Sequence, residues 1–206
     1  MSRKFIFLLF ALFFITTCYG CASLNANVPF RYQPSLVSSA KKIDKTVGLN
    51  MLLDKRPEGD IAYTKSIKDI SEKVTAKLLE DFKVSNIFKE IHYPVQIEDD
   101  IVINGTIDRF IWKLYATPIS YIPILNLVVY FGVPMNEAYG IASISLEIKN
   151  NKTGMVIGKL GEFSQTNNSY TLYNFKAGEA GTELEEAFRE VAKKLKEGLL
   201  IKVDLE

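Results

Sequence analysis

Apolar residues recur at every second position in several stretches of the chain, and this spacing predicts β-strands. A first strand is expected at about 46–53 and a short one at about 87–93. In the longer strand that follows, the apolar residues change parity between Ile107 and Phe110. A change of parity turns side chains to the opposite face of a sheet, so we expect a bulge near residues 108–109.

The clearest alternation lies at 142–148, and residues 155–163 are expected to return as its hairpin partner after a turn at 150–154. Elsewhere, helical spacing of apolar residues predicts one helix at about 65–83 and another that begins near Thr182. The expected buried stripes are Ile67, Ile70, Val74, Leu78 and Phe82 in the first helix, and Leu184, Ala187, Phe188, Val191, Leu195 and Leu199 in the second. This order of elements predicts an α+β fold, with a mostly antiparallel sheet and two helices packed on one face.

The beginning of the chain has the pattern of a secretory signal peptide. Arg3 and Lys4 are followed by Phe5–Ile15, an unbroken apolar run, and then by small or polar residues. A membrane-spanning helix needs about 20 apolar residues, so this run is too short to remain as an anchor. Its length and position are those of the apolar region of a signal peptide.

Both cysteines of the chain, Cys18 and Cys21, lie directly behind this run. A C-x-x-C spacing can be a redox pair or half of a zinc site, but the first needs a strand-to-helix junction and the second another cysteine pair. The stretch Tyr19–Ser23 instead resembles the lipobox of bacterial lipoproteins, in which a small residue precedes the cysteine that becomes the acylated N-terminus. Gly20 fits that pattern before Cys21, although Cys18 stands where the pattern prefers Leu. Cleavage before Cys18 would follow Thr17, which matches the pattern less well.

The resemblance implies that Cys21 is the lipidated first residue of the mature protein and that Cys18 leaves with the signal peptide. In this family, a residue other than Asp after the cysteine implies release to the outer membrane, and Ala22 is consistent with that. We therefore expect a signal peptide at 1–20, a flexible tether at 21–45 and a single periplasmic domain at 46–206. Such a tether could span up to about 80 Å if fully extended.

Composition limits the partners of this domain. The chain of 206 residues is 48% hydrophobic and 24% charged, as expected of one ordinary globular domain. Its formal net charge is +1, and Lys and Arg are spread among nearly equal numbers of Asp and Glu. A nucleic acid partner would need clustered basic residues, so none is expected.

Candidate catalytic and metal-binding residues are few. The single His92 is expected in a surface or edge strand, with no Ser or Cys motif to complete a catalytic triad. Glu98–Asp100 are expected in a solvated turn, because consecutive acids point apart whereas a hard cation needs about six oxygen ligands. Asp54–Arg56 are expected to form a salt-bridged surface turn. We therefore expect no enzyme activity, no metal and no cofactor.

The most informative stretch of the expected domain is residues 118–134, an apolar segment punctuated by prolines. Two interpretations remain open. Residues 125–131 could form a buried strand or close one end of the core, or the segment could be an exposed loop that enters a bilayer or docks on a partner. Tyr suits such an interface because its ring is apolar and its hydroxyl is polar. The candidate contact residues are Tyr121, Ile124, Leu127, Tyr130 and Phe131.

The layout of the domain is similar to that of small outer-membrane lipoproteins, with the hairpin at 142–157 as its most typical part. Examples are the YajG-like lipoproteins, the accessory lipoprotein of lipopolysaccharide assembly and the auxiliary lipoproteins of ABC-type lipid transport. The resemblance implies a lipid-anchored, non-enzymatic adaptor or assembly accessory on the periplasmic face of the outer membrane, with an envelope protein as partner. The alternative is a module that binds a lipid or other apolar ligand between sheet and helices.

Overall fold

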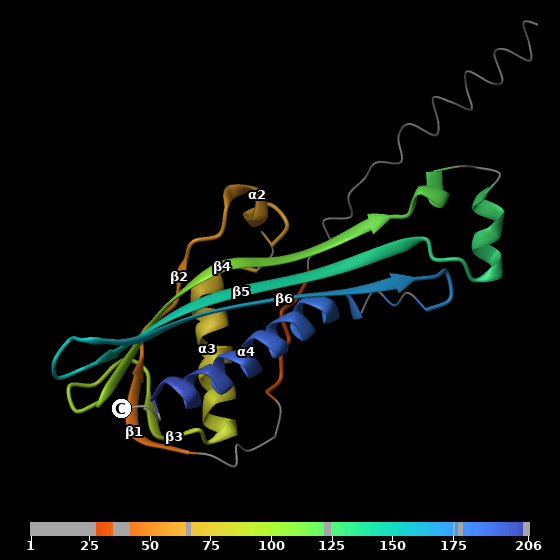
Figure 1. Ribbon diagram of the computed structural model, residues 1–206. Coiled ribbons are helices and arrows are strands. Elements are labelled where there is room, and N and C mark those ends of the chain that lie inside the picture. The colour runs from red at the N-terminus through yellow and green to blue at the C-terminus, as the bar shows by residue number, and fades with distance from the viewer. Residues whose placement is uncertain are drawn as a thin grey trace, which may run out of the picture.

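The computed structural model describes residues 28–34, 42–64, 67–121, 125–174, 176 and 179–203. Within these residues the chain forms a six-stranded sheet, three helices and two 3₁₀ segments (Figure 1). The strands are β1 (Ile43–Leu49), β2 (Leu53–Asp54), β3 (Phe88–His92), β4 (Ile101–Ala116), β5 (Asn136–Asn150) and β6 (Val156–Tyr170). The helices are α2 (Glu58–Ile61), α3 (Ile70–Ser85) and α4 (Thr182–Val203), and the 3₁₀ segments are η1 (Pro118–Tyr121) and η2 (Leu125–Phe131).

The sheet combines an antiparallel part with a smaller parallel part. Strand order is β3-β1-β4-β5-β6, with β2 beside β4. The long strands β4, β5 and β6 are antiparallel, whereas β1 is parallel to both β3 and β4, and β2 is parallel to β4. Parallel strands need a crossover connection, and α3 supplies it between β1 and β3. The α+β class is therefore confirmed, and the mostly antiparallel sheet gains parallel pairs that the sequence did not predict.

The two long helices cover different parts of this sheet (Figure 1). α4 lies along β5 and β6, whereas α3 contacts β2 and β3 and meets α4. The two helices thus divide the sheet between them, and their packing as one layer on a single face stays a prediction.

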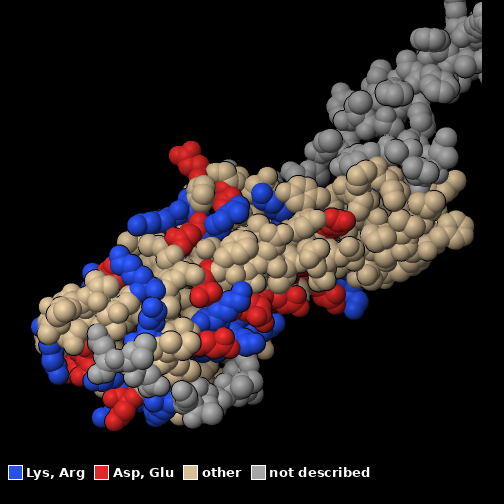
Figure 2. All heavy atoms as spheres, in the orientation of Figure 1, with Lys and Arg blue, Asp and Glu red and all other residues tan. Residues whose placement is uncertain are grey.

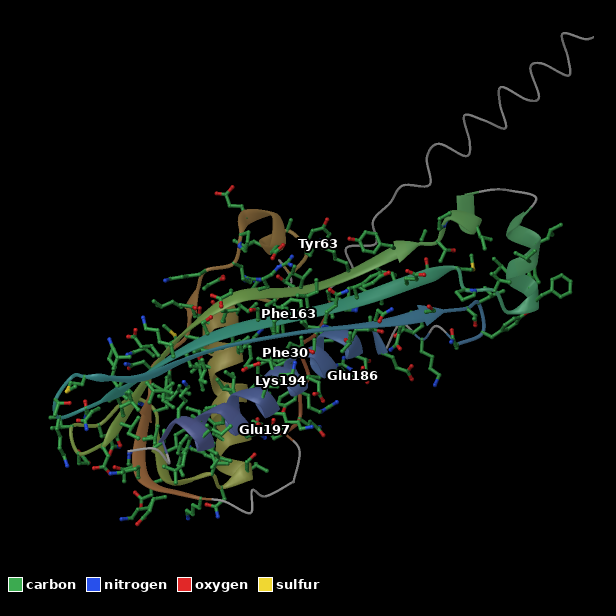
Figure 3. All side chains as sticks on the ribbon, in the orientation of Figure 1. Phe30, Tyr63, Phe163, Glu186, Lys194 and Glu197 are labelled. Atoms are coloured by element: carbon green, nitrogen blue, oxygen red, sulfur yellow. The ribbon has the colours of Figure 1, made fainter. Side chains whose placement is uncertain are left out.

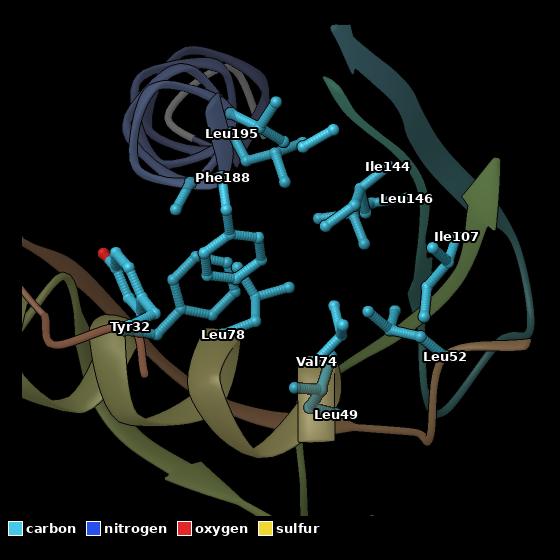
Figure 4. Packing of buried hydrophobic residues seen from close by; sticks show 14 of the residues in the cluster. Tyr32, Leu49, Leu52, Val74, Leu78, Ile107, Ile144, Leu146, Phe188 and Leu195 are labelled. Carbon is cyan, nitrogen blue, oxygen red and sulfur yellow. The ribbon is translucent and has the colours of Figure 1, made fainter. Parts of the chain in front are cut away.

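The core lies between these helices and the sheet. Every residue of the two predicted helical stripes is buried, and Figure 4 shows Val74 and Leu78 of α3 and Phe188 of α4 around the same space as Ile144 of β5. α3 begins at Ile70, later than predicted, because Asp69 before it has a φ of 54°, in the left-handed region that a right-handed helix does not use.

The predicted bulge in the third strand is confirmed. The register between β4 and β5 shifts between Ile107 and Arg109, so that Ile107 and Phe110 are both buried. The bulged residue, Asp108, accepts hydrogen bonds from the hydroxyls of Thr106 at 2.7 Å and Ser145 at 2.5 Å. The polar side chain at the bulge is therefore held in place by two partners.

Residues 28–34, here called the N-terminal segment, pack on the core, which corrects the predicted tether of 21–45. Val28 and Tyr32 are 3% and 1% exposed, and the Phe30 ring lies edge-on to Phe110 and Phe188 with centroids 5.0 and 5.3 Å apart. β1 also begins earlier than predicted, at Ile43. Phe30 and Tyr32 are too few to form a periodic pattern in the sequence. Their burial depends on residues that are distant in the sequence, such as Phe188, so it was not predicted. Residues 21–27 and 35–41 lie outside the described residues.

A buried polar contact fixes the N-terminal segment to both long helices. The Tyr32 hydroxyl donates a hydrogen bond to one carboxylate oxygen of Asp81 in α3 at 2.6 Å, and Lys196 of α4 lies 2.6 Å from the other oxygen. Burial, and secondarily the Asp81 carboxylate, raises the pKa of Tyr32 above its ordinary value. The segment is therefore part of the folded domain and not of the tether.

Candidate functional site at the far end of the sheet

The antiparallel strands continue beyond the N-terminal end of α4 as an arm, defined here as residues 113–139 and 167–174 (Figure 1). No charged residue occurs between Lys113 and Glu137, or between Glu162 and Lys176. Figure 2 shows the consequence: the arm end is almost free of Lys, Arg, Asp and Glu, whereas charged side chains gather over the rest of the visible face. The arm is therefore chemically distinct from the rest of the domain.

The segment between β4 and β5, here called the tip (residues 117–135), exposes large apolar side chains. Leu127, Tyr130 and Phe131 are 62%, 65% and 86% exposed, while Val129 is only 2% exposed. Residues 125–131 form a 3₁₀ segment, so the buried-strand interpretation is wrong. The side chains of Tyr121 and Ile124 lie outside the described residues.

The tip is joined to the arm by specific backbone contacts. The amide of Thr117 donates to the carbonyl of Met135 at 2.7 Å, and the amide of Met135 donates to the carbonyl of Tyr170 at 2.8 Å. The Thr117 hydroxyl also donates to the carbonyl of Pro134 at 2.9 Å. These bonds link the ends of β4, β5 and β6, so an ordered base presents the apolar side chains.

Two further residues of the exposed surface come from the turn after β6 and were missed in the sequence. Leu172 and Tyr173 are 48% and 67% exposed, and the Tyr173 hydroxyl donates to the carbonyl of Tyr130 at 2.7 Å. The uncharged run between Glu162 and Lys176 was the feature of the sequence that could have indicated them. The apolar patch thus comprises Leu127, Tyr130, Phe131, Leu172 and Tyr173.

A buried carboxylate fastens the arm to α4. Glu183 is fully buried, and its carboxylate accepts hydrogen bonds from Trp112 Nε1 at 2.8 Å, Asn168 Nδ2 at 3.2 Å and the Tyr170 hydroxyl. Burial, and secondarily this carboxylate, raises the pKa of Tyr170. A Cβ at Gly140 would lie 2.1 Å from the Glu183 backbone, so only glycine permits this close approach of helix and strand.

The face of the arm that points away from α4 carries a cleft of about 480 Å³. Its lining residues are Lys113, Tyr115, Ala116, Thr117, Pro118, Glu137, Tyr139, Ile141 and Gln165. The Tyr139 hydroxyl donates to Glu137 at 2.5 Å, which raises the pKa of Tyr139. Tyr63 lies beside α2 (Figure 3). Nζ of Lys113 lies over its ring, 4.0 Å from the ring centroid. The cleft therefore combines apolar walls with polar groups, of which Glu137 and Tyr139 bond each other.

The other candidate residues have structural contacts at the opposite end of the sheet. His92 ends the edge strand β3, as predicted, and its Nδ1 lies 2.5 Å from Asp99. This contact with Asp99 raises the pKa of His92. The predicted solvated turn at Glu98–Asp100 is wrong in part, because Asp99 is fully buried and Asp100 accepts hydrogen bonds from Thr46. Both carboxylates find donors in the neighbouring backbone and side chains.

The last sequence predictions concern a salt bridge, metal ligands and the lipidation site. Asp54 and Arg56 form the predicted salt bridge at 2.8 Å, but the Arg56 side chain is only 5% exposed, so the pair is not a simple surface one. The described residues hold no cluster of His, Cys, Asp or Glu suited to a metal ion. Cys21 lies outside the described residues, and no helix within them is long and apolar enough to cross a membrane.

Comparisons with known proteins show a likeness of fold. The sequence matches no family model and no curated protein. Protein XCC0632 from Xanthomonas campestris has a TM-score of 0.51 at 9% identity, over 86% of this chain and 95% of that one. Rare lipoprotein B from Shewanella oneidensis gives a TM-score of 0.41 at 12% identity, over 78% of this chain and 98% of that one. A minor lipoprotein from Acinetobacter baumannii also gives 0.41, at 8% identity over 76% and 93%. XCC0632 shares the fold, and the two lower scores carry no argument.

Proposed function

We propose that the protein is a lipid-anchored lipoprotein of the bacterial envelope, held at the periplasmic face of the outer membrane through Cys21. The support comes from the basic start, the short apolar run and the Gly20-Cys21 pair. Several acyl chains on one N-terminus would give stable anchoring, since a single chain binds a membrane only reversibly.

The domain then acts as a non-enzymatic adaptor or assembly accessory, and one observation carries this proposal. The apolar patch is exposed at the end of an arm that carries no charged residue between Lys113 and Glu137. Exposed side chains contribute nothing to the core, whereas burying Leu127, Tyr130 and Phe131 against a contact surface would contribute on the order of 4–9 kcal/mol before ordering costs. The patch is therefore suited to contact and not to the stability of the fold.

The contacts of the titratable residues support the absence of catalysis. Nδ1 of His92 faces Asp99, and no described hydroxyl or thiol forms a nucleophile pair with this ring. The buried carboxylates of Asp81 and Glu183 are occupied by Tyr, Trp, Asn or Lys partners. These groups hold elements of the fold together.

Two measurements test the proposed function. Mass spectrometry of the mature N-terminus should find an acylated Cys21, and an unmodified Cys21 in native protein would contradict the anchor. Chemical crosslinking in cells followed by pull-down should recover a discrete envelope protein. If a Leu127→Ser, Phe131→Ser double variant recovers it equally well, the partner does not bind the tip.

A second candidate function is the binding of an apolar ligand. The space between sheet and helices is filled by the core side chains, so a ligand there would have to displace them. The cleft beside Tyr115 and Tyr139 has a volume within the range of small-molecule sites and favours this alternative. Native mass spectrometry of the purified protein would detect a retained lipid, and Ile141→Glu should abolish that retention if the cleft is its site.

A further inference from the structure

The N-terminal segment leaves the domain at the same end as the arm. Val28 lies against Gly181, directly before α4, where an added Cβ would lie 2.3 Å from the Val28 side chain. Further along, the amide of Arg31 donates to Glu185 at 2.7 Å, and the Tyr32 ring meets Phe188 with centroids 4.7 Å apart. The segment therefore runs along α4 from its N-terminal end, and residues that precede Val28 start beside the arm.

The chain between the lipidation site and the domain is short. Because residues 28–34 belong to the folded domain, only seven residues, 21–27, lie between the lipidation site and that domain. At 3.3–3.6 Å each, they reach at most about 25 Å. Beyond Trp112, the residue that contacts Glu183, β4 continues to Ala116, which adds about 13 Å to the arm. An anchor at Cys21 can thus reach the level of Ala116, after which the tip begins, but it cannot hold the domain far from the membrane.

The chemistry of the arm favours a bilayer over a protein surface. A protein interface surrounds its apolar centre with a polar and often charged rim. Here the uncharged zone continues well past the apolar patch, to Lys113, Glu137 and Glu162. Charged side chains are costly in a bilayer, whereas Tyr is enriched at its surface because its ring is apolar and its hydroxyl polar. The patch contributes two such residues, Tyr130 and Tyr173, beside Leu127 and Phe131.

We propose that the tip is a second membrane contact, seated in the surface of the same lipid bilayer that holds the acylated Cys21. This inference depends on the proposed lipid anchor, which brings the arm to the membrane. Because the arm carries no basic residue beyond Lys113, the contact requires no anionic lipid and should form on zwitterionic phosphatidylcholine.

Site-specific labelling of the full acylated chain tests this contact. Once Cys21 is acylated and Cys18 removed, the mature sequence holds no free thiol, so Phe131→Cys accepts a single environment-sensitive fluorophore. Ile97→Cys is the matched control: Ile97 is 95% exposed against 86% for Phe131, and its carbonyl contacts Asn151 at the opposite end of β5. The two sites are separated by about 45–50 Å along that strand.

Both proteins are reconstituted in phosphatidylcholine vesicles, with and without chain-brominated phosphatidylcholine as a quencher. The emission of the residue-131 probe should shift to the blue, and its fluorescence should be quenched by the brominated lipid, while the residue-97 probe should show neither change.

If the protein floats with the vesicles but both probes stay in water, the tip contact is overturned and the anchor stands. If the protein lacks acyl chains and does not float, the anchor and the tip contact both fail. If the residue-131 probe is already shielded in the detergent-solubilised protein, and the unlabelled Phe131→Cys protein forms an interchain disulfide there when copper phenanthroline oxidises the two thiols, a second copy covers the tip and the proposal is wrong.

Discussion

The arm and the body of the domain use apolar residues in opposite ways. The body is defined here as β1–β3, α3, α4 and the part of the sheet that these helices cover. In the body, Phe188 is fully buried among aromatic and aliphatic neighbours, and polar side chains such as Asp81 pair inside. In the arm, Phe131 is 86% exposed and the surrounding sequence is uncharged. The comparison separates residues that stabilise the fold from residues that the fold only presents.

The largest expected effect is a difference in the free energy of unfolding between the same Phe→Ala substitution made in the body and in the arm. Phe188→Ala should lower the free energy of unfolding by about 3–5 kcal/mol, because it leaves a cavity in the core. Phe131→Ala should change it by no more than about 0.5 kcal/mol, because the ring has little packing to lose. Urea denaturation followed by circular dichroism measures both. A large loss from Phe131→Ala would mean that the tip helps to stabilise the domain, and the comparison would fail.

The joint between the two regions should show the next largest effect. Glu183→Ala leaves the Trp112, Asn168 and Tyr170 donors without their shared acceptor, which should cost about 2–4 kcal/mol of unfolding free energy. Glu186→Ala is the control, since Glu186 is exposed on the same helix (Figure 3). Hydrogen exchange should also rise at β4 and β6 near the joint. Equal stability of the two variants would show that the carboxylate does not fasten the arm.

A smaller effect is expected where the N-terminal segment meets the body. Tyr32→Phe keeps the ring but removes the hydrogen bond to Asp81, which should cost about 1–2 kcal/mol. Limited proteolysis should then cut the chain near residues 28–34 faster than in the wild type. Tyr173→Phe serves as the control at an exposed tyrosine, and its cleavage near the segment should match the wild type.

The smallest expected effect is a pH dependence that comes from the body alone. Asp99 raises the pKa of His92 above the usual value of 6.5, so the folded state binds the proton more tightly than the unfolded state. The contribution to stability is complete below about pH 6.5 and is lost as pH rises through the raised pKa. Thermal melts from pH 6 to 9 should show this decline, and His92→Gln should flatten it. An unchanged slope in the variant would exclude His92 as its source.

The features that sequence patterns predicted are local ones. The parity change around Asp108 predicted the bulge, and the stripe from Val74 to Phe82 predicted the buried face of α3, because side-chain spacing follows directly from backbone geometry. The exposed interpretation of residues 118–134 rested on the same kind of local signal.

The features that were missed depend on contacts between distant residues. Strand direction leaves no mark on alternation, so the parallel pairs of β1 were not predicted. Tyr32 is buried against Phe188 of α4 and bonds Asp81 of α3, and Asp99 lies against Gly48 of β1, so neither burial is visible from neighbouring residues in the sequence. Tyr173 joins the apolar patch only because β6 returns beside β5.

The direction of α4 has a practical consequence for attaching probes. The helix starts at the arm and its 22 residues extend about 33 Å away from it. A reporter joined before Val28 would crowd the tip, whereas one placed near Val203 would stand on the far side of the domain. Affinity tags, fluorescent partners and surface-immobilisation handles therefore belong after α4 when the aim is to leave the arm free.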